Sequence, residues 1–246
     1  MINLKNKYCV VSGCNGHIGQ AISKRLNKLG AKVIGTDVKS DKKNLNLLAF
    51  IKVNLEHKDE IDKLIKSLNK RYKKIDILIN NAGHVGSTEN NKNINKIFYN
   101  EKYENLNLSN SIYLTNSLVP LLNKSKSASI INICSIYSSL AYDYSLYEKT
   151  NMNTPLAYGV SKAGMMHYSK MLSTALAPKI RVNSISPGGI FRNQPKKFLK
   201  RYLNKTPLSR MGHENDVANA VIFLSSELSS YITGQNIIVD GGYSVS

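Results

Sequence analysis

The sequence predicts an α/β protein built on a doubly wound parallel sheet of about seven strands, with helices on both faces. Short, β-branched, apolar runs alternate with amphipathic stretches from one end of the chain to the other, which is the pattern of consecutive βαβ units. Most of these runs are apolar on both faces, as parallel strands covered by helices are. The 246 residues contain no linker and no internal repeat, so we expect a single domain over residues 1–246.

Each strand and helix is predicted from its own stretch of sequence. Strands are expected at residues 8–12, 32–36, 49–53, 75–79, 129–134, 181–185 and 236–239. Helices are expected where apolar residues recur with helical spacing, at residues 17–29, 58–73, 103–122, 155–176 and 214–225. Two polar segments interrupt the alternation: the Asn-rich residues 87–100, predicted as an exposed loop, and the Tyr-rich residues 141–154.

The composition predicts neither a nucleic-acid-binding protein nor a membrane protein. The formal net charge is +18, but 28 of the 34 basic residues are Lys, spread along the chain like the 29 Asn. An Arg-rich arm or a basic cluster interleaved with aromatic residues would indicate nucleic acid, and neither is present. The chain has no run of 18 apolar residues, and its N-terminus lacks the apolar core of a signal peptide.

The cysteines predict reduced thiols and a cytoplasmic protein. Cys9, Cys14 and Cys134 fall in or beside predicted strands, and an odd, small number of cysteines does not suggest a disulfide framework. No spacing of Cys and His residues resembles a metal site, so no metal is expected.

A glycine-rich turn follows the first predicted strand and begins the first predicted helix. Residues 12–19, SGCNGHIG, permit a tight turn and a close approach of the backbone to a diphosphate at the helix N-terminus. Asp37 ends the second strand, 18 positions after Gly19, where a carboxylate accepts hydrogen bonds from an adenosine ribose. Asp37 therefore favours NAD over NADP, although it could instead form a strand-end turn. Three nearby lysines could offset its repulsion of a 2′-phosphate: Lys39, Lys42 and Lys43.

Tyr158 and Lys162 stand four residues apart in the predicted helix 155–176, on one face and one turn apart. An ammonium beside a phenol favours the phenolate and lowers the pKa of the phenol from its ordinary value near ~10. A Tyr with such a pKa can take a proton from an alcohol or give one to a ketone. The pair therefore indicates acid–base catalysis, and a packed ring beside a solvated charge is the alternative.

Six motifs in order along the chain resemble those of the short-chain dehydrogenase/reductase family, over essentially the whole length. They are residues 13–19, Asn80-Asn81-Ala82-Gly83, Asn107, Ser135, Tyr158 with Lys162, and Ser186-Pro187-Gly188-Gly189. Two C-terminal pieces also fit, Thr233-Gly234-Gln235 and Asp240-Gly241-Gly242. The resemblance implies a Rossmann fold and an NAD-dependent oxidoreductase that interconverts a secondary alcohol and a ketone by hydride transfer.

The resemblance also implies roles for the matching residues. Tyr158 is the general acid/base, and Lys162 binds the nicotinamide ribose and lowers the pKa of Tyr158. Ser135 hydrogen-bonds the substrate oxygen, and Asn107 holds a water that links Lys162 to solvent. The implied cofactor-binding residues are Gly13, Asn15, Gly16, His17, Ile18, Gly19, Asp37, Val38, Asn54, Leu55, Asn81, Ala82, Gly83, Tyr158, Lys162, Pro187, Gly188 and Ile190. The expected substrate-binding residues are Ser135, Tyr137, Tyr147, Asn151, Gly189 and Gln194.

Three departures from the family pattern leave alternatives open. His17 stands where the family usually has Gly, and the resulting glycine spacing is commoner in sugar-nucleotide epimerases and dehydratases that retain NAD. Ser135 lies 23 positions before Tyr158, farther than is usual, so Ser138 and Ser139 are rivals for its role. Arg192 replaces the family's usual Thr.

Three segments are expected to set substrate specificity: residues 84–99, 137–153 and 191–203. Their sequences resemble a bacterial subgroup linked to legionaminic-acid and related surface-sugar pathways, which implies a nucleotide-activated amino sugar as substrate. The family also implies a homo-oligomer, a dimer or a tetramer, formed through the helix 103–122 and the strand 236–239. A non-catalytic member that binds NAD(H) is the remaining alternative.

Overall fold

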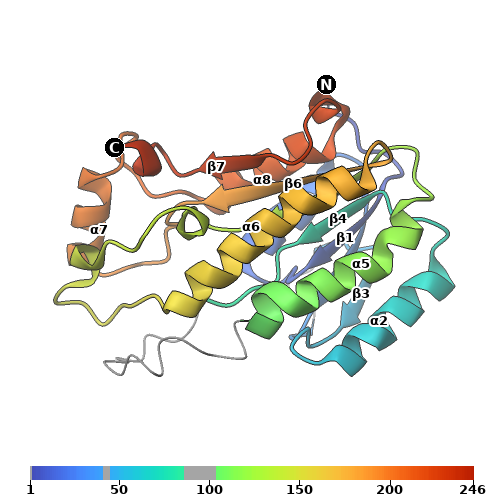
Figure 1. Ribbon diagram of the computed structural model, residues 1–246, viewed down its shortest axis with the longest axis horizontal. Helices are drawn as coiled ribbons and strands as arrows, with labels where there is room; N and C mark the ends of the chain where they lie inside the picture. The colour runs from blue at the N-terminus through green and yellow to red at the C-terminus, as the bar shows by residue number, and fades with distance from the viewer. Residues whose placement is uncertain (1, 41–44, 86–103) are drawn as a thin grey trace.

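The computed structural model describes residues 2–40, 45–85 and 104–246. Its centre is a seven-stranded sheet in the order β3-β2-β1-β4-β5-β6-β7 (Figure 1), and every neighbouring pair is parallel. The strands are β1 (Tyr8–Ser12), β2 (Lys32–Asp37), β3 (Ala49–Lys52), β4 (Ile77–Asn80), β5 (Ala128–Ile133), β6 (Ile180–Pro187) and β7 (Asn236–Val239). This order confirms the doubly wound parallel sheet predicted from the sequence.

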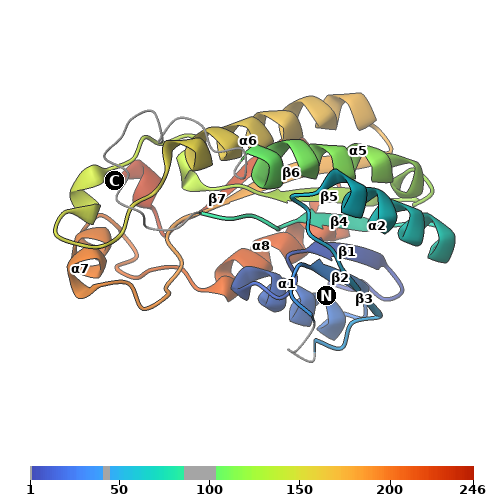
Figure 2. The same cartoon turned by 90° about the horizontal axis from the view of Figure 1, so that it is seen from below.

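Helices cover both faces of the sheet. On one face α1 (His17–Lys28) and α8 (Glu214–Ser225) pack against each other, and the other face carries α2 (Lys58–Arg71), α5 (Asn110–Leu122) and α6 (Leu156–Leu176) (Figure 2). Successive residues of β1 serve the two faces in turn: Cys9 and Val11 pack with the first pair of helices, and Val10 packs on the opposite side. The strands are apolar on both faces because each face is buried.

The element boundaries differ from the predictions where local sequence is ambiguous. Strand β6 runs two residues further than expected, to Pro187, and carries the chain to the edge where the site lies. The predicted helix 103–122 is a short π-helical segment, Asn105–Ser109, followed by α5. Helix α7 (Lys196–Asn204) was not predicted, because its nine residues are too few for a clear periodic signal. The predicted loop 87–100 lies outside the described residues.

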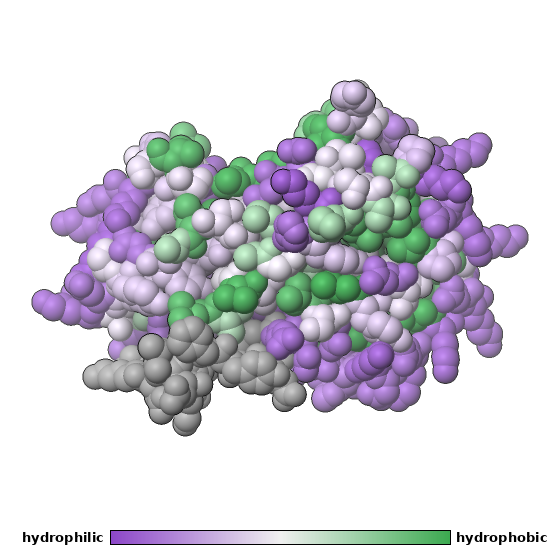
Figure 3. Space-filling model, viewed as in Figure 1, coloured by the Kyte–Doolittle hydropathy of each residue, from purple (hydrophilic) through white to green (hydrophobic). Residues whose placement is uncertain are grey.

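The surface seen in Figure 3 carries a band of apolar side chains over the face that α5 and α6 present. Two of the apolar side chains on α6 are strongly exposed, Val160 at 71% and Met171 at 60%. Within the described part of the chain, no helix is long and apolar enough to cross a membrane.

Candidate active site

The candidate site lies at the carboxyl ends of the central strands. After β1 the chain builds β2 and β3 to one side, and it then returns to place β4 to β7 on the other side. In such sheets ligands bind in the crevice where the strand order reverses. Two adjoining cavities lie there and share five lining residues: Ile18, Asn81, Gly83, Val85 and Arg192.

The larger cavity, of about 660 Å³, is lined by most of the residues expected to bind the cofactor. They are Gly13, Asn15, Gly16, His17, Ile18, Gly19, Asp37, Val38, Asn54, Leu55, Asn81, Ala82 and Gly83. The remaining five line the smaller cavity: Tyr158, Lys162, Pro187, Gly188 and Ile190. The structure therefore gathers into these two adjoining cavities residues that are far apart in the sequence.

The larger cavity fits a dinucleotide in two respects. Helix α1 begins there with Gly16 as its N-cap, and no side chain caps it, so its first N–H groups and the helix dipole suit a diphosphate. Thr36 lines the same cavity, and its buried Oγ1 has no hydrogen-bond partner among the described residues. A buried hydroxyl without a partner is costly, and a bound ligand is one way to provide that partner.

Asp37 forms the strand-end contacts that its position allowed, and it also lines the larger cavity. Its Oδ2 accepts a hydrogen bond from the Asn15 N–H at 2.9 Å, and its Oδ1 accepts one from the Lys39 N–H at 3.0 Å. These bonds tie the end of β2 to the glycine-rich turn. The carboxylate also lines the larger cavity, and each of its oxygens has a second lone pair for a ligand hydroxyl.

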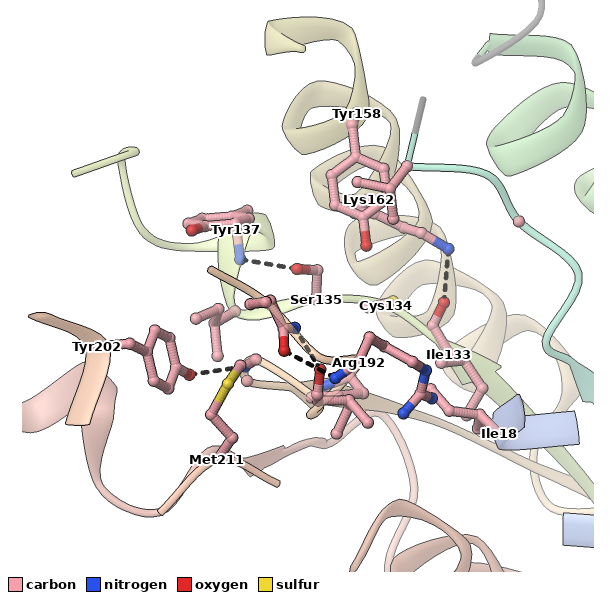
Figure 4. Close-up of a pocket in the computed structure, with 18 of the residues that line it drawn as sticks. Ile18, Ile133, Cys134, Ser135, Tyr137, Tyr158, Lys162, Arg192, Tyr202 and Met211 are labelled. Carbon is pink, nitrogen blue, oxygen red and sulfur yellow. Dashed lines mark hydrogen bonds between the residues drawn. The ribbon is translucent and has the colours of Figure 1, made fainter. Parts of the chain in front are cut away.

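The smaller cavity, of about 380 Å³, brings Ser135, Tyr158 and Lys162 together (Figure 4). Ser135 lies two residues after the end of β5, and the other two lie on successive turns near the start of α6. The Lys162 side chain is only 5% exposed, and its Nζ donates a hydrogen bond of 2.8 Å to the Ile133 carbonyl. The backbone at the end of β5 thus fixes the ammonium in the site.

The phenol of Tyr158 favours its protonated form in this geometry. Burial raises its pKa to about 12, and the nearby Ser135 hydroxyl offsets only part of that rise. The Lys162 Nζ is directed at the Ile133 carbonyl and lies 5.9 Å from the centre of the Tyr158 ring. Burial also lowers the pKa of Lys162.

Ser135 is better placed for catalysis than its two rivals. It lines the smaller cavity together with Tyr158, whereas Ser138 and Ser139, both described, are not among the lining residues. The Ser138 hydroxyl accepts a hydrogen bond from the Ser135 N–H, and the Ser139 hydroxyl faces Met166. The extra residues between Ser135 and Tyr158 form a loop that includes a 3₁₀ turn, Tyr144–Tyr147. This loop does not displace Ser135 from the cavity.

Asn107 lies behind the cavities and lines neither of them. Its Oδ1 accepts from the His84 N–H at 2.9 Å, and its Nδ2 donates to the His84 carbonyl at 3.0 Å. A Cβ on Gly83 would lie 3.0 Å from Asn107 Oδ1 and 3.2 Å from Lys162 Nζ. Asn107 and Lys162 therefore both lie beside Gly83. Asn107 also belongs to a π-helical segment, a feature often found at functional sites.

Four of the substrate-binding residues that were expected beyond Ser135 line the smaller cavity: Tyr137, Tyr147, Gly189 and Gln194. Tyr147 shares hydrogen bonds with the Tyr137 hydroxyl at 3.0 Å and the Thr154 hydroxyl at 2.9 Å. The side-chain amide of Gln194 stabilises its own loop: it accepts a hydrogen bond from the Arg192 N–H and donates one to the Ile190 carbonyl. Asn151 is exposed and is not brought to the cavity. Residues 86–99 of the first specificity segment lie outside the described residues.

Helix α7, which lies largely in the predicted specificity segment 191–203, adds a wall to the smaller cavity, but sequence reasoning did not name its lining residues. Phe198 and Tyr202, four residues apart on α7, line it together with Met211. The Tyr202 hydroxyl accepts a hydrogen bond of 2.6 Å from the Gly189 N–H, so α7 also holds the loop after β6. The spacing of Phe198 and Tyr202 on one helical face was the available signal.

A dinucleotide-sized cavity beside a Tyr–Lys pair, on a doubly wound sheet, defines a class of protein: oxidoreductases that use a nicotinamide dinucleotide. Residues 14–244 match a family model described as enoyl-(acyl carrier protein) reductase. The chain belongs to the short-chain dehydrogenase/reductase family, as its motifs predicted.

Similar proteins agree with this assignment over nearly the full length. The chain is 35% identical to 3-oxoacyl-[acyl-carrier-protein] reductase FabG of Buchnera aphidicola subsp. Schizaphis graminum, with 98% of each chain covered. It is 31% identical to post-translational flagellin modification protein A of Campylobacter coli, covering 98% of this chain and 99% of the relative. A short-chain dehydrogenase of Leptospira borgpetersenii with bound NAD+ has 34% identity and a TM-score of 0.86, covering 99% of this chain and 94% of that one.

Proposed function

We propose that this protein is an NAD-dependent oxidoreductase that interconverts a secondary alcohol and a ketone on a nucleotide-activated sugar, with amino sugars of surface-glycan biosynthesis as first candidates. One observation carries the reaction type: Tyr158, Ser135 and Lys162 together line a cavity that adjoins the dinucleotide cavity. The coarser statement, a dehydrogenase or reductase, follows from the family itself.

In the proposed mechanism the substrate oxygen lies between the hydroxyls of Ser135 and Tyr158. When bound, the dinucleotide supplies or accepts the hydride, and the protein provides orientation and proton transfer. During reduction Tyr158 gives its proton to the developing alkoxide while Ser135 stabilises the charge by hydrogen bonding. During oxidation the phenolate of Tyr158 takes the hydroxyl proton, and the buried Lys162 ammonium stabilises that phenolate.

NAD is the preferred cofactor in this proposal because Asp37 lines the larger cavity. A carboxylate there accepts hydrogen bonds from ribose hydroxyls and repels a 2′-phosphate. The Leptospira relative was solved with bound NAD+, which supports the same choice.

The substrate proposal rests on the hydroxyl groups of the smaller cavity. Tyr137 and Tyr147 line it, and their hydroxyls bond each other at 3.0 Å; polar groups of this kind in a cavity wall suit a molecule rich in hydroxyls. Its volume, about 380 Å³, suits one sugar ring, so an attached nucleotide would extend outward through the opening. The similarity to a flagellin modification protein supports a role in the modification of surface structures.

A second candidate substrate is a 3-oxoacyl thioester carried on an acyl carrier protein. The similarity to 3-oxoacyl-[acyl-carrier-protein] reductase favours it, and so does the apolar part of the cavity wall, which includes Ile136, Phe198 and Met211. The hydroxyl groups on the opposite side favour the sugar, which is why we place the sugar first.

A substrate screen tests the proposal. Purified protein is assayed with GDP- and UDP-linked amino sugars, with acetoacetyl thioesters, and with NADH and NADPH in parallel. We expect reversible turnover with a nucleotide sugar and a preference for NADH. Turnover is measured from the near-ultraviolet absorbance of the reduced cofactor. Turnover of thioesters alone would establish the second candidate. Product formation without net change in NADH would indicate an epimerase or dehydratase that retains NAD, and binding without turnover would indicate a non-catalytic member.

The direction of the Tyr158 pKa shift predicts how the activity depends on pH. Because burial raises this pKa to about 12, Tyr158 is protonated at neutral pH and ready to donate in reduction. Between about pH 6 and pH 9 we expect kcat/KM for ketone reduction to stay flat and kcat/KM for alcohol oxidation to rise about tenfold per pH unit. An oxidation profile that levels off near neutrality would contradict this and would indicate that Lys162 turns toward the phenol during catalysis.

The proposal includes a homo-oligomer. The exposed apolar residues of α6, Val160 and Met171, support an interface on that face, and Ile238 of β7 is also 45% exposed. Exposed apolar side chains are common at protein–protein contacts.

A further inference from the structure

Arg192 lies where the two cavities meet. It belongs to the loop between β6 and α7 and lines both the larger and the smaller cavity. Its guanidinium extends toward Ile18 in the first turn of α1 (Figure 4). A single cationic group therefore faces the space that joins the cofactor cavity to the substrate cavity.

The guanidinium is held at this position by an ion pair. Arg192 Nη1 lies 2.9 Å from Glu214 Oε1, and the same oxygen lies 3.6 Å from His17 Nδ1. The other carboxylate oxygen, Oε2, lies 3.1 Å from His213 Nε2. One carboxylate thus contacts an arginine and two histidines, and it fixes the Arg192 guanidinium at the junction of the two cavities.

The loop itself is braced so that the side chain keeps its place. Gln194 Oε1 accepts from the Arg192 N–H at 2.7 Å, and Gln194 Nε2 donates to the Ile190 carbonyl at 2.8 Å. Asn193 between them has a φ of 55°, in the left-handed region that Asn tolerates better than most residues. A braced loop lowers the entropy that Arg192 would lose when it binds a ligand.

We propose that Arg192 binds a phosphate or diphosphate group at the junction of the two cavities. A guanidinium has five N–H donors in a planar fork, so it can keep Glu214 on one edge and present others to a phosphate. The N-terminus of α1, which is not capped by a side chain, faces the same space and adds its own N–H groups. The inference rests on the proposed function, because the anion is either the diphosphate of the dinucleotide or that of a nucleotide-activated substrate.

Calorimetric titration of Arg192→Gln tests the inference and separates the two sources. In the first arm the protein is titrated with NADH, ADP-ribose and adenosine. If the anion belongs to the dinucleotide, the Kd values for NADH and ADP-ribose rise about tenfold or more, as for a lost charge-assisted hydrogen bond, and the affinity for adenosine is unchanged. In the second arm NADH-saturated protein is titrated with UDP and GDP. If the anion belongs to the substrate, only these affinities fall.

Two further variants keep the test decisive. Lys197→Gln removes the same charge from an exposed position on α7, and it should bind every ligand as the wild type does. Arg192→Lys keeps the positive charge but not the planar fork of donors. Its affinity for the anion should lie between those of the wild type and Arg192→Gln, and it can be measured even if Arg192→Gln folds poorly. Unchanged affinities in both arms for the Arg192 variants would overturn the inference, as would an equal loss in Lys197→Gln. A wild-type protein that binds no NADH would instead refute the proposed function.

Discussion

Replacing Tyr158 with Phe is expected to lower kcat by about 10³-fold, because the general acid/base is removed from both directions of the reaction. The ring stays, so its packing beside Lys162 is kept, and the Lys162 hydrogen bond to the Ile133 carbonyl does not involve the lost hydroxyl. The Kd for NADH should therefore stay within about twofold of the wild type. Steady-state turnover and calorimetric titration of NADH measure the two quantities.

Tyr168→Phe is the matched control for this change. Tyr168 lies on the same helix, α6, and its hydroxyl donates to Asn116 Oδ1 at 2.7 Å on the exposed face, away from both cavities. The control loses the same atom and should keep full turnover. If Tyr158→Phe keeps substantial turnover, or if both variants lose it equally, Tyr158 is not the catalytic group.

The part of the site that could be predicted from sequence is the part set by short-range rules. Residues 13–19 and Asp37 each follow a recognisable strand, and parallel strands bring their carboxyl ends to one edge of the sheet. Tyr158 and Lys162 share one face of a helix through their spacing alone. For these residues, local sequence and sheet topology together determine the position.

The remaining features depend on contacts between distant segments. Arg192 meets Glu214 only because the loop after β6 reaches the start of α8. Tyr202 reaches the Gly189 N–H because α7 folds back over that loop. The spacing of Tyr158 and Lys162 also could not reveal that the ammonium is directed at the Ile133 carbonyl, because that contact depends on where β5 ends.

Replacing Gly19 with Ala is expected to lower the free energy of unfolding by about 3 kcal/mol. A Cβ at this position would lie 2.1 Å from the Gly13 carbonyl oxygen and 2.9 Å from Cys14 Cα. That carbonyl cannot easily move, because it accepts a hydrogen bond of 3.0 Å from Asn81 Nδ2. The turn must open, so the N–H groups of α1 would no longer face a diphosphate correctly, and the Kd for NADH should rise about tenfold or more. Urea unfolding and NADH titration measure these two losses.

Gly16→Ala is the control that distinguishes the two glycines of the turn. A Cβ on Gly16 would meet only the Gly13 carbonyl, at 3.3 Å, and its φ of −66° is open to any residue. Small local shifts can relieve such a contact, so the unfolding free energy should change by about 0.5 kcal/mol or less. Equal losses in the two variants would show that the turn tolerates no side chain at all. We expect the larger loss of unfolding free energy for Gly19→Ala because Gly19 packs against Gly13. This contact holds the start of α1 against the end of β1.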